Sequence, residues 1–261
     1  MDEHLPFLRA VAANPADDLP RLVFADFLEE SGEPDSIARA HFIRAQIALT
    51  QLTPRTKEYR ETDALIKRLL RHYSNDWLWD LPEYLHNYGQ PQWHRGFIEF
   101  TKMPWRNFIE GVIFETVPIT RVQIDTVHTG HGVTPETLDA LSHVRRTTHL
   151  RLGPQLYDDG DSLLFLLLQA RSFAGLTHLD FSENDFEHLA SFVLRFGEAA
   201  FARTLVTLNL SDVEGLDDAV GSALATARGL ESLDRLILKR TELSEPVRAM
   251  IRRRFGERVM F

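Results

Sequence analysis

The most constraining feature of this 261-residue chain is the stretch Leu176-Thr-His-Leu179-Asp-Phe181-Ser-Glu-Asn184. Around Leu179 and Phe181 its apolar residues alternate with polar ones. This is the spacing that places successive side chains on opposite faces of a β-strand. We therefore expect Leu179 and Phe181 to point into a core and the polar residues between them to point away from it. A turn is expected directly after the strand.

Similar strands recur through the second half of the chain at a nearly constant interval. The first inward apolar residue of each strand is expected at Ile98, Val122, Leu150, Leu179, Leu208 and Leu236, with spacings of 24, 28, 29, 29 and 28 residues. A period of 28 to 29 residues accommodates a strand, a turn, a helix and a return loop. The predicted intervening helices cover about residues 104–114, 135–144, 162–171, 186–201, 217–227 and 245–255, and a last short strand is expected over 258–261.

The pattern L-x-x-L-x-L-x-x-N at this period resembles leucine-rich repeats of the long, ribonuclease-inhibitor-like type. The resemblance implies an α/β fold for residues 94–261, in which about five to six repeats stack into a solenoid with a parallel concave sheet and outer helices. Strands stack about 4.8 Å apart, whereas helix axes need roughly 8–10 Å. Such a stack must therefore bend, with the strands on its concave side.

Residues 1–93 are predicted to form a separate, small all-α domain with its connector. Apolar residues at helical spacing predict a first helix from about Leu5 to the stop signal Asn14-Pro15. Three more helices are predicted over about residues 20–30, 36–52 and 57–73. An aromatic-rich, proline-punctuated connector then leads to Trp93.

Two elements of this helical region resemble a known family. Pro20-Arg-Leu-Val-Phe-Ala-Asp-Phe-Leu-Glu-Glu30 and Phe42-Ile-Arg-Ala-Gln46 resemble the bacterial repeat-companion domain, a short helical module found ahead of leucine-rich or other repeats. The resemblance covers roughly residues 4–52 and implies a structural module without an assigned activity. We expect it to cap the N-terminal end of the solenoid. We also expect Asp26 or Glu30 to pair with Arg44 and lock two of its helices together.

Composition narrows the classes of function. The formal net charge of -9 argues against nucleic acid as a partner, because phosphate binding needs clustered Lys and Arg. The chain has no cysteine, which excludes disulfides, thiolate nucleophiles and Cys-based zinc sites. The longest apolar run, 163–168, is far shorter than the roughly 20 residues of a membrane span, and we see no secretory signal. We therefore expect a cytoplasmic protein, monomeric or weakly self-associating, that binds neither nucleic acid nor membrane.

The polar side chains of the predicted strands are the candidate binding site. Protein partners usually bind the concave faces of such solenoids, so the resemblance implies a protein–protein interaction scaffold with an unknown protein partner. The candidate contact residues are Glu99, Arg121, Gln123, Asp125, His149, Arg151, His178, Asp180, Ser182, Thr207, Asn209, Arg235 and Lys239.

The alternative function is a metal-dependent hydrolase. His149 and His178 are expected to be neighbours with Asp180 nearby, and two His with a carboxylate can ligate zinc or iron. Two further metal patterns are weaker: His128-Thr-Gly-His131 lacks a helical H-E-x-x-H context, and 157–161 lacks the alternating oxygen ligands of a calcium loop. The chain has no phosphate-binding glycine loop, nucleophile elbow or dinucleotide fingerprint. We therefore expect a non-enzymatic protein without a cofactor or a metal.

Overall fold

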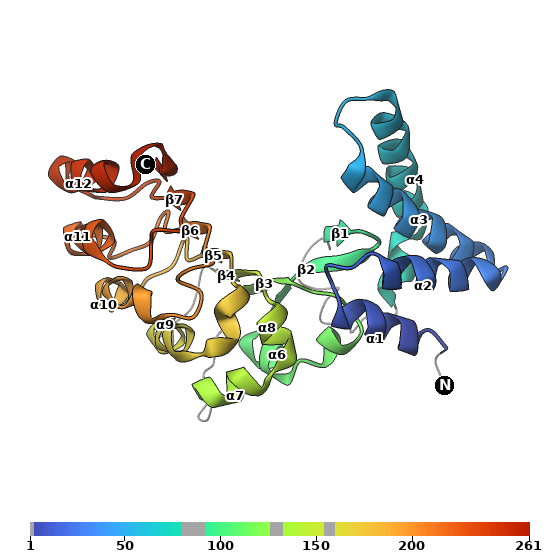
Figure 1. Cartoon of the computed structure of the whole chain (residues 1–261), viewed down its shortest axis with the longest axis horizontal. Coiled ribbons are helices and arrows are strands. Elements are labelled where there is room, and N and C mark those ends of the chain that lie inside the picture. The colour runs from blue at the N-terminus through green and yellow to red at the C-terminus, as the bar shows by residue number, and fades with distance from the viewer. Residues whose placement is uncertain (1–2, 80–91, 126–132, 154–159) are drawn as a thin grey trace. The chain divides into compact units, whose positions relative to one another are not determined.

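The computed structural model describes residues 3–79, 92–125, 133–153 and 160–261. They form a mixed α/β fold with a mostly parallel, eight-stranded sheet in the hydrogen-bonded order β1-β2-β3-β4-β5-β6-β7-β8 (Figure 1). The chain divides into two compact units. The first unit comprises Met1–Thr101 and Gly111–Thr120, and the second unit comprises Lys102–Glu110 and Arg121–Phe261. The boundary expected from the sequence lay between residues 93 and 94.

Four helices make up most of the first unit: α1 (Leu5–Ala13), α2 (Leu19–Glu30), α3 (Pro34–Gln51) and α4 (Lys57–Trp79). The four predicted helices are confirmed, and α4 continues beyond its expected end at residue 73. A proline lies in the first turn of each of α1, α2 and α3, where its missing N–H breaks no helical hydrogen bond. Phe24 and Leu28 of α2 pack with Ile43 of α3 in a buried core.

A short hairpin in the first unit lies against α3. Strand β1 (Gln92–His94) pairs antiparallel with β2 (Phe97–Met103), and Gly96 in the turn has a φ of 87°. A Cβ at Gly96 would overlap Ile43, so only glycine fits there. The Gly96 N–H donates to Gln46 Oε1 at 2.7 Å, and Gln46 Nε2 donates to the Trp93 carbonyl at 3.4 Å. Gln46, the last residue of the second family-like element, therefore ties the hairpin to α3.

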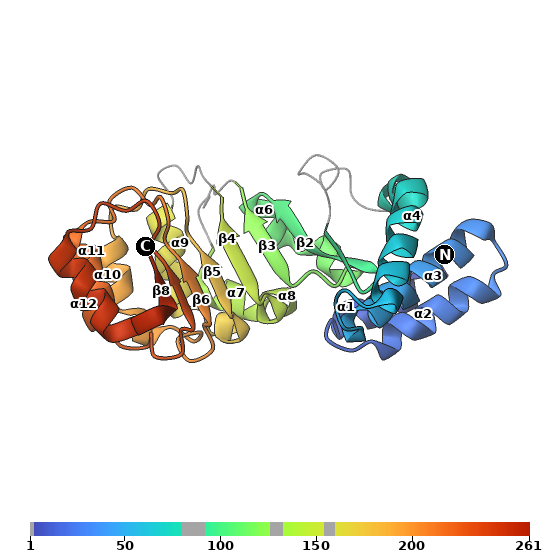
Figure 2. The ribbon, with the colours of Figure 1, turned by 90° about the horizontal axis from the view of Figure 1, so that it is seen from above.

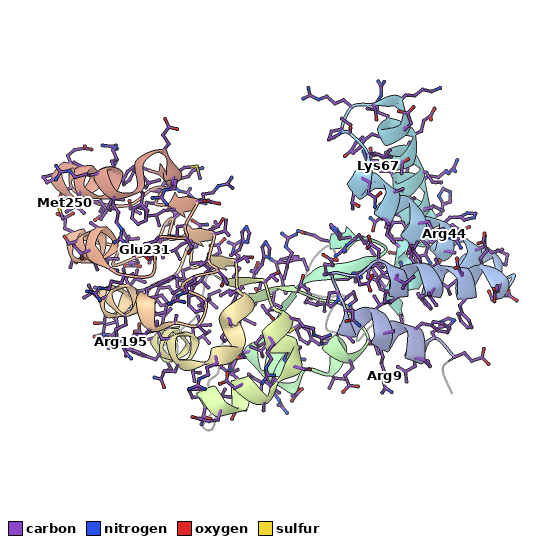
Figure 3. All side chains as sticks on the ribbon, viewed as in Figure 1. Arg9, Arg44, Lys67, Arg195, Glu231 and Met250 are labelled. Atoms are coloured by element: carbon purple, nitrogen blue, oxygen red, sulfur yellow. The ribbon has the colours of Figure 1, made fainter. Side chains whose placement is uncertain are left out.

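Arg44 on α3 links this helix to α2 (Figure 3). Its guanidinium lies 2.6 Å from Asp26 Oδ1 and 2.8 Å from Glu29 Oε2. The predicted pairing with Asp26 is confirmed, but the second carboxylate is Glu29 rather than Glu30. Residues three apart share one face of a helix, so Asp26 and Glu29 can both face Arg44.

The second unit is built on parallel strands. They are β3 (Arg121–Ile124), β4 (His149–Leu152), β5 (His178–Asp180), β6 (Thr207–Asn209), β7 (Arg235–Ile237) and β8 (Val259–Met260). The register pairs Val122 with Leu150 and continues through Leu179 and Leu208 to Leu236. These side chains are buried, as the sequence predicts. The predicted final strand is also present, because Leu236 of β7 pairs with Val259 of β8.

Helices follow the strands of the second unit in sequence. They are α6 (Trp105–Glu110), α7 (Pro135–Ala140), α8 (Ser142–Arg146), α9 (Gly160–Gln169), α10 (Leu189–Leu194), α11 (Asp218–Thr226) and α12 (Glu245–Phe255), and 3₁₀ turns include η2 (Arg171–Gly175), η3 (Phe196–Glu198) and η4 (Gly256–Arg258). Figures 1 and 2 show α9 to α12 on one side of β4 to β8. Among the described residues, no helix is long and apolar enough to cross a membrane.

Three of the predicted helices are shorter or interrupted. Gly111, with a φ of 68°, separates α6 from the 3₁₀ turn η1 (Val112–Glu115), and Leu141 is extended between α7 and α8. The helix predicted over 186–201 begins only at Leu189 in α10. Asp185 forms a parallel bridge with Glu214, which holds the backbone extended just before this helix. The pairing of Asp185 with Glu214 therefore opposes helix formation in the residues just before Leu189.

Asn184 connects two neighbouring strand–turn segments in the interior of the second unit. Its buried side-chain Nδ2 donates to the Leu152 carbonyl at 3.0 Å, and to the carbonyls of Phe181 at 3.2 Å and Ser182 at 3.0 Å. The turn predicted after β5 is thus held by this amide. At the equivalent place after β7, the Thr241 hydroxyl donates to the Leu238 carbonyl at 2.9 Å.

Candidate functional site

Side chains of four parallel strands form one polar surface on the second unit, here called the polar sheet face. It comprises His149 and Arg151 of β4, His178 and Asp180 of β5, Thr207 and Asn209 of β6, and Arg235 and Ile237 of β7. Because these strands are parallel and in register, equivalent side chains lie side by side. The residue between each pair is buried, whereas the members of the face are half-buried or exposed.

Two histidines stack on β4 and β5 of the polar sheet face. The rings of His149 and His178 have centroids 3.8 Å apart and planes inclined by 9°. The Thr177 hydroxyl donates to the Thr148 carbonyl at 3.0 Å and lies 2.9 Å from His178 Nδ1. Since that hydroxyl has one proton to donate, His178 Nδ1 carries the ring proton and Nε2 is left as an acceptor.

Both histidines are neutral near neutral pH. Burial lowers the pKa of His149 to about 4, and the neighbouring charges of His178 and Arg121 act in the same direction. Burial also lowers the pKa of His178, with further lowering from Arg121 and Arg235. Arg121 and Arg235 lie at the positions equivalent to the two histidines on β3 and β7, and their charges help to keep the stacked rings neutral.

A chain of hydrogen bonds fixes the side chains of Asp180 on β5 and Asn209 on β6. Asp180 Oδ1 accepts from the Ser182 N–H at 2.9 Å and from Asn209 Nδ2 at 3.0 Å. The Ser211 hydroxyl donates to Asn209 Oδ1 at 2.7 Å. Arg151 Nε lies 3.9 Å from Asp180 Oδ2, which makes a longer, half-exposed ion pair. These contacts hold Asp180 and Asn209 in fixed orientations.

The other predicted contacts differ in accessibility. Arg121 and Lys239 are exposed at the margins of the polar sheet face. Asp125 is half-buried and accepts a hydrogen bond from Gln123 Nε2 at 2.8 Å. Gln123 and Ser182 are buried, so their side chains offer little surface to a partner.

Glu99 was predicted as an accessible contact, and this prediction is wrong. Its carboxylate lies in the first unit, 3.2 Å from Arg21 Nη2 and 3.1 Å from Arg95 Nη2. The Arg21 side chain is 0% exposed and that of Glu99 11%. Burial lowers the pKa of Arg21 to about 10, and the charge of Arg95 acts in the same direction. Burial along β2 does not follow the predicted alternation, because Phe97, Glu99 and Thr101 are buried as well as Ile98. The Glu99 carboxylate is covered by Arg21, which α2 supplies.

One contributor to the surface was not predicted. Glu183 lies three residues beyond the end of β5 and has a φ of 63°, and its carboxylate lies 3.7 Å from Arg151 Nη2. A left-handed backbone conformation at a glutamate has no clear signature in the sequence. The sequence indicated only that Glu183 lies in the turn after β5.

The residues of the alternative metal site, His149, His178 and Asp180, do not form a cluster of ligand atoms. Within the described ranges, the three-residue group with ligand atoms within 4.8 Å of one another is Asp161, Glu187 and His188, not His149, His178 and Asp180. Two members of that group are exposed, and Asp161 Oδ1 already accepts the His188 N–H at 3.1 Å. The pattern His128–His131 and most of 157–161 lie outside the described residues.

No protein-family model, curated protein or solved structure matches the chain. The chemistry of the polar sheet face is therefore argued from its own geometry. The Ser211 hydroxyl donates to Asn209 rather than to a histidine, so it does not form a nucleophile–base pair. The face presents fixed hydrogen-bond donors, acceptors and charges on a sheet.

Proposed function

We propose that the second unit is a leucine-rich-repeat solenoid of the ribonuclease-inhibitor-like type, and that the protein is a non-enzymatic scaffold whose polar sheet face binds a protein partner. The 28- to 29-residue spacing and the parallel in-register strands support the repeat assignment. The first unit is proposed to be a repeat-companion domain, supported by its helices and by the role of Gln46 in holding the hairpin.

The observation that carries the binding proposal is the hydrogen-bonded order of the polar sheet face. Asp180 and Asn209 are oriented by neighbouring groups, and His149 and His178 are held by their stacking. Side chains that are already fixed lose less conformational entropy when a partner binds. Polar side chains that only face solvent do not require such contacts between strands.

The partner is proposed to contribute acidic side chains. Three basic residues, Arg121, Arg235 and Lys239, are exposed on or beside the polar sheet face. The carboxylates of Asp180 and Glu183 are both within ion-pair distance of Arg151. Together with Arg151 there are four basic residues against the three acids Asp125, Asp180 and Glu183, so the local charge is slightly positive although the whole chain has a net charge of -9. Such a local patch attracts a complementary acidic surface.

Affinity capture with chemical cross-linking tests this proposal. We expect a specific partner to cross-link to strand residues of the second unit, and Arg235→Glu combined with Arg121→Glu to reduce its affinity at least about tenfold. The matched control is Arg195→Glu, on the helix side of the unit (Figure 3). Arg195 is exposed and pairs locally with Glu198. Undiminished binding by the double variant, or equal loss with Arg195→Glu, would reject the polar sheet face as the binding surface.

A further inference from the structure

The first unit contains a cavity of roughly 270 Å³ that the proposed function does not use. The buried part of its lining is apolar: Phe24 and Leu28 of α2, Phe97 and Ile98 of β2, and Val117 are each at most 6% exposed. The rings of Phe24 and Phe97 have centroids 6.0 Å apart. An aromatic and aliphatic lining of this kind accommodates a flat apolar ring.

The exposed part of the lining, here called the rim, is acidic. It consists of Asp35 in the first turn of α3 and Asp76 in the last turn of α4, which are both exposed. Neither carboxylate has an ion-pair partner among the described residues. Ser36, next to Asp35, also lines the cavity and is half-buried. The cavity therefore has a negatively charged rim and an apolar interior.

One guanidinium, that of Arg39 on α3, also belongs to the lining. Its carbon lies 4.7 Å from the ring centroid of Trp77 and 4.6 Å from that of Trp93. These cation–π contacts hold Arg39 against the two indoles, so a ligand's charge is left to the rim carboxylates. Two carboxylates against one guanidinium give the lining a net charge of -1 with His4 counted as neutral. This charge favours a cation over an anion.

We propose that this cavity binds a small organic cation with one ammonium group and a planar apolar ring. The ring would lie against Phe24 and Leu28, and the ammonium would stay at the rim near Asp35 and Asp76. Burial of the ring supplies most of the affinity, and an ammonium at an exposed rim avoids the cost of burying a charge. All the lining residues belong to the first unit, whereas the polar sheet face belongs to the second. The site is therefore tested separately from the proposed function.

Titration of the full chain at pH 8 with three indoles that differ in charge tests the proposal. Tryptamine carries an ammonium group, tryptophol a neutral hydroxyl and indole-3-acetate a carboxylate. We expect saturable binding of tryptamine by calorimetry with a Kd of about 1 mM or lower, as for a ligand of this size. Tryptophol should bind at least about threefold and indole-3-acetate at least about tenfold more weakly. Absence of saturable tryptamine binding, or equal or tighter binding of either other compound, would overturn the proposal.

A variant of the rim locates the binding. Asp76→Asn should weaken tryptamine binding at least about threefold and leave tryptophol binding unchanged, because only tryptamine presents a charge to this carboxylate. Glu58→Gln is the matched control, since Glu58 is exposed on the same helix, loses the same charge and does not line the cavity. Wild-type affinity for tryptamine in Asp76→Asn would reject the rim as the ammonium site. Equal weakening in both variants would also reject it, because the effect would then come from the net charge of the chain.

Discussion

The rings of His149 and His178 stack on neighbouring strands, with centroids 3.8 Å apart and planes inclined by 9°. Parallel in-register pairing of β4 with β5 brings them together. Burial is the main cause of the low pKa of His149, and the nearby positive charges of Arg121 and His178 lower it further. The polar sheet face therefore contains a pair of side chains that responds to acid.

Stability should fall between about pH 6.5 and pH 4. The pKa of His149 is about 4 in the folded protein, against 6.5 for an ordinary histidine. As the pH falls through this window, the unfolded chain takes up a proton that the folded protein does not, which favours unfolding. Denaturant unfolding at pH 7, 5.5 and 4.5 should show a smaller loss of stability for His149→Gln than for the wild type. His72→Gln, exposed on α4, is the control, and a His149→Gln variant that follows the wild-type curve would contradict the expectation.

Leu179→Asp should unfold the second unit. Leu179 is 0% exposed and sits between Leu150 and Leu208 in the register. A carboxylate there would be buried without a partner, and we expect a destabilisation above about 4 kcal/mol. Circular dichroism during thermal unfolding measures this. Arg235→Ala, on the exposed side of the sheet, should change stability by less than about 0.5 kcal/mol. Equal melting temperatures for the Leu179 variant and wild type would show that the strand register is wrong.

Asn184→Ala should be destabilising although no charge is involved. The substitution removes the donor of three contacts to backbone carbonyls, including the one to Leu152 in the preceding repeat. Carbonyls left without a donor in the interior cost about 1–3 kcal/mol, which a shift in the urea midpoint would report. Asp185→Ala, one residue further and exposed, is expected to have little effect. A comparable loss in both variants would mean that the amide contacts contribute nothing specific.

Glu99→Gln should destabilise the first unit by about 3–5 kcal/mol, because it removes the carboxylate next to the buried guanidinium of Arg21. Asp18, which already pairs with Arg95 at 3.2 Å, is then left to balance both arginines. Combining it with Arg21→Met should recover part of the loss, since the unpaired buried charge is then gone. The exposed pair of Arg9 and Glu115, 3.7 Å apart, provides the control. Glu115→Gln should cost less than about 1 kcal/mol. Additive effects of the Glu99 and Arg21 substitutions in denaturant unfolding would argue against a coupled pair.

Much of the fold could be predicted because it depends on local periodicity. Alternating apolar residues identified the strands around Leu150, Leu179 and Leu208, and α12 has the bounds expected from its apolar spacing and from its Ser244-Glu-Pro246 start. Neither the late start of α10 nor the division of the helix at Gly111 followed from such a pattern. Both depend on backbone conformations set by neighbouring segments.

The sequence predicted which strand residues form the polar sheet face, but not which of the predicted contact residues are exposed. Equal spacing of the repeats was enough to place His149 beside His178, because parallel strands in register align equivalent residues. The same reasoning treated Glu99 as exposed, since it cannot show that Arg21, 78 residues away in sequence, covers this carboxylate.

The sequence by itself determined which side chains of β4 to β7 face the core, because that choice follows from the two-residue period of a strand and the burial of apolar surface. Only the tertiary structure decided which outward polar groups remain accessible, which are paired and which are left without a partner. These properties depend on contacts between residues far apart in the chain. No local pattern encodes the contact between Arg21 and Glu99.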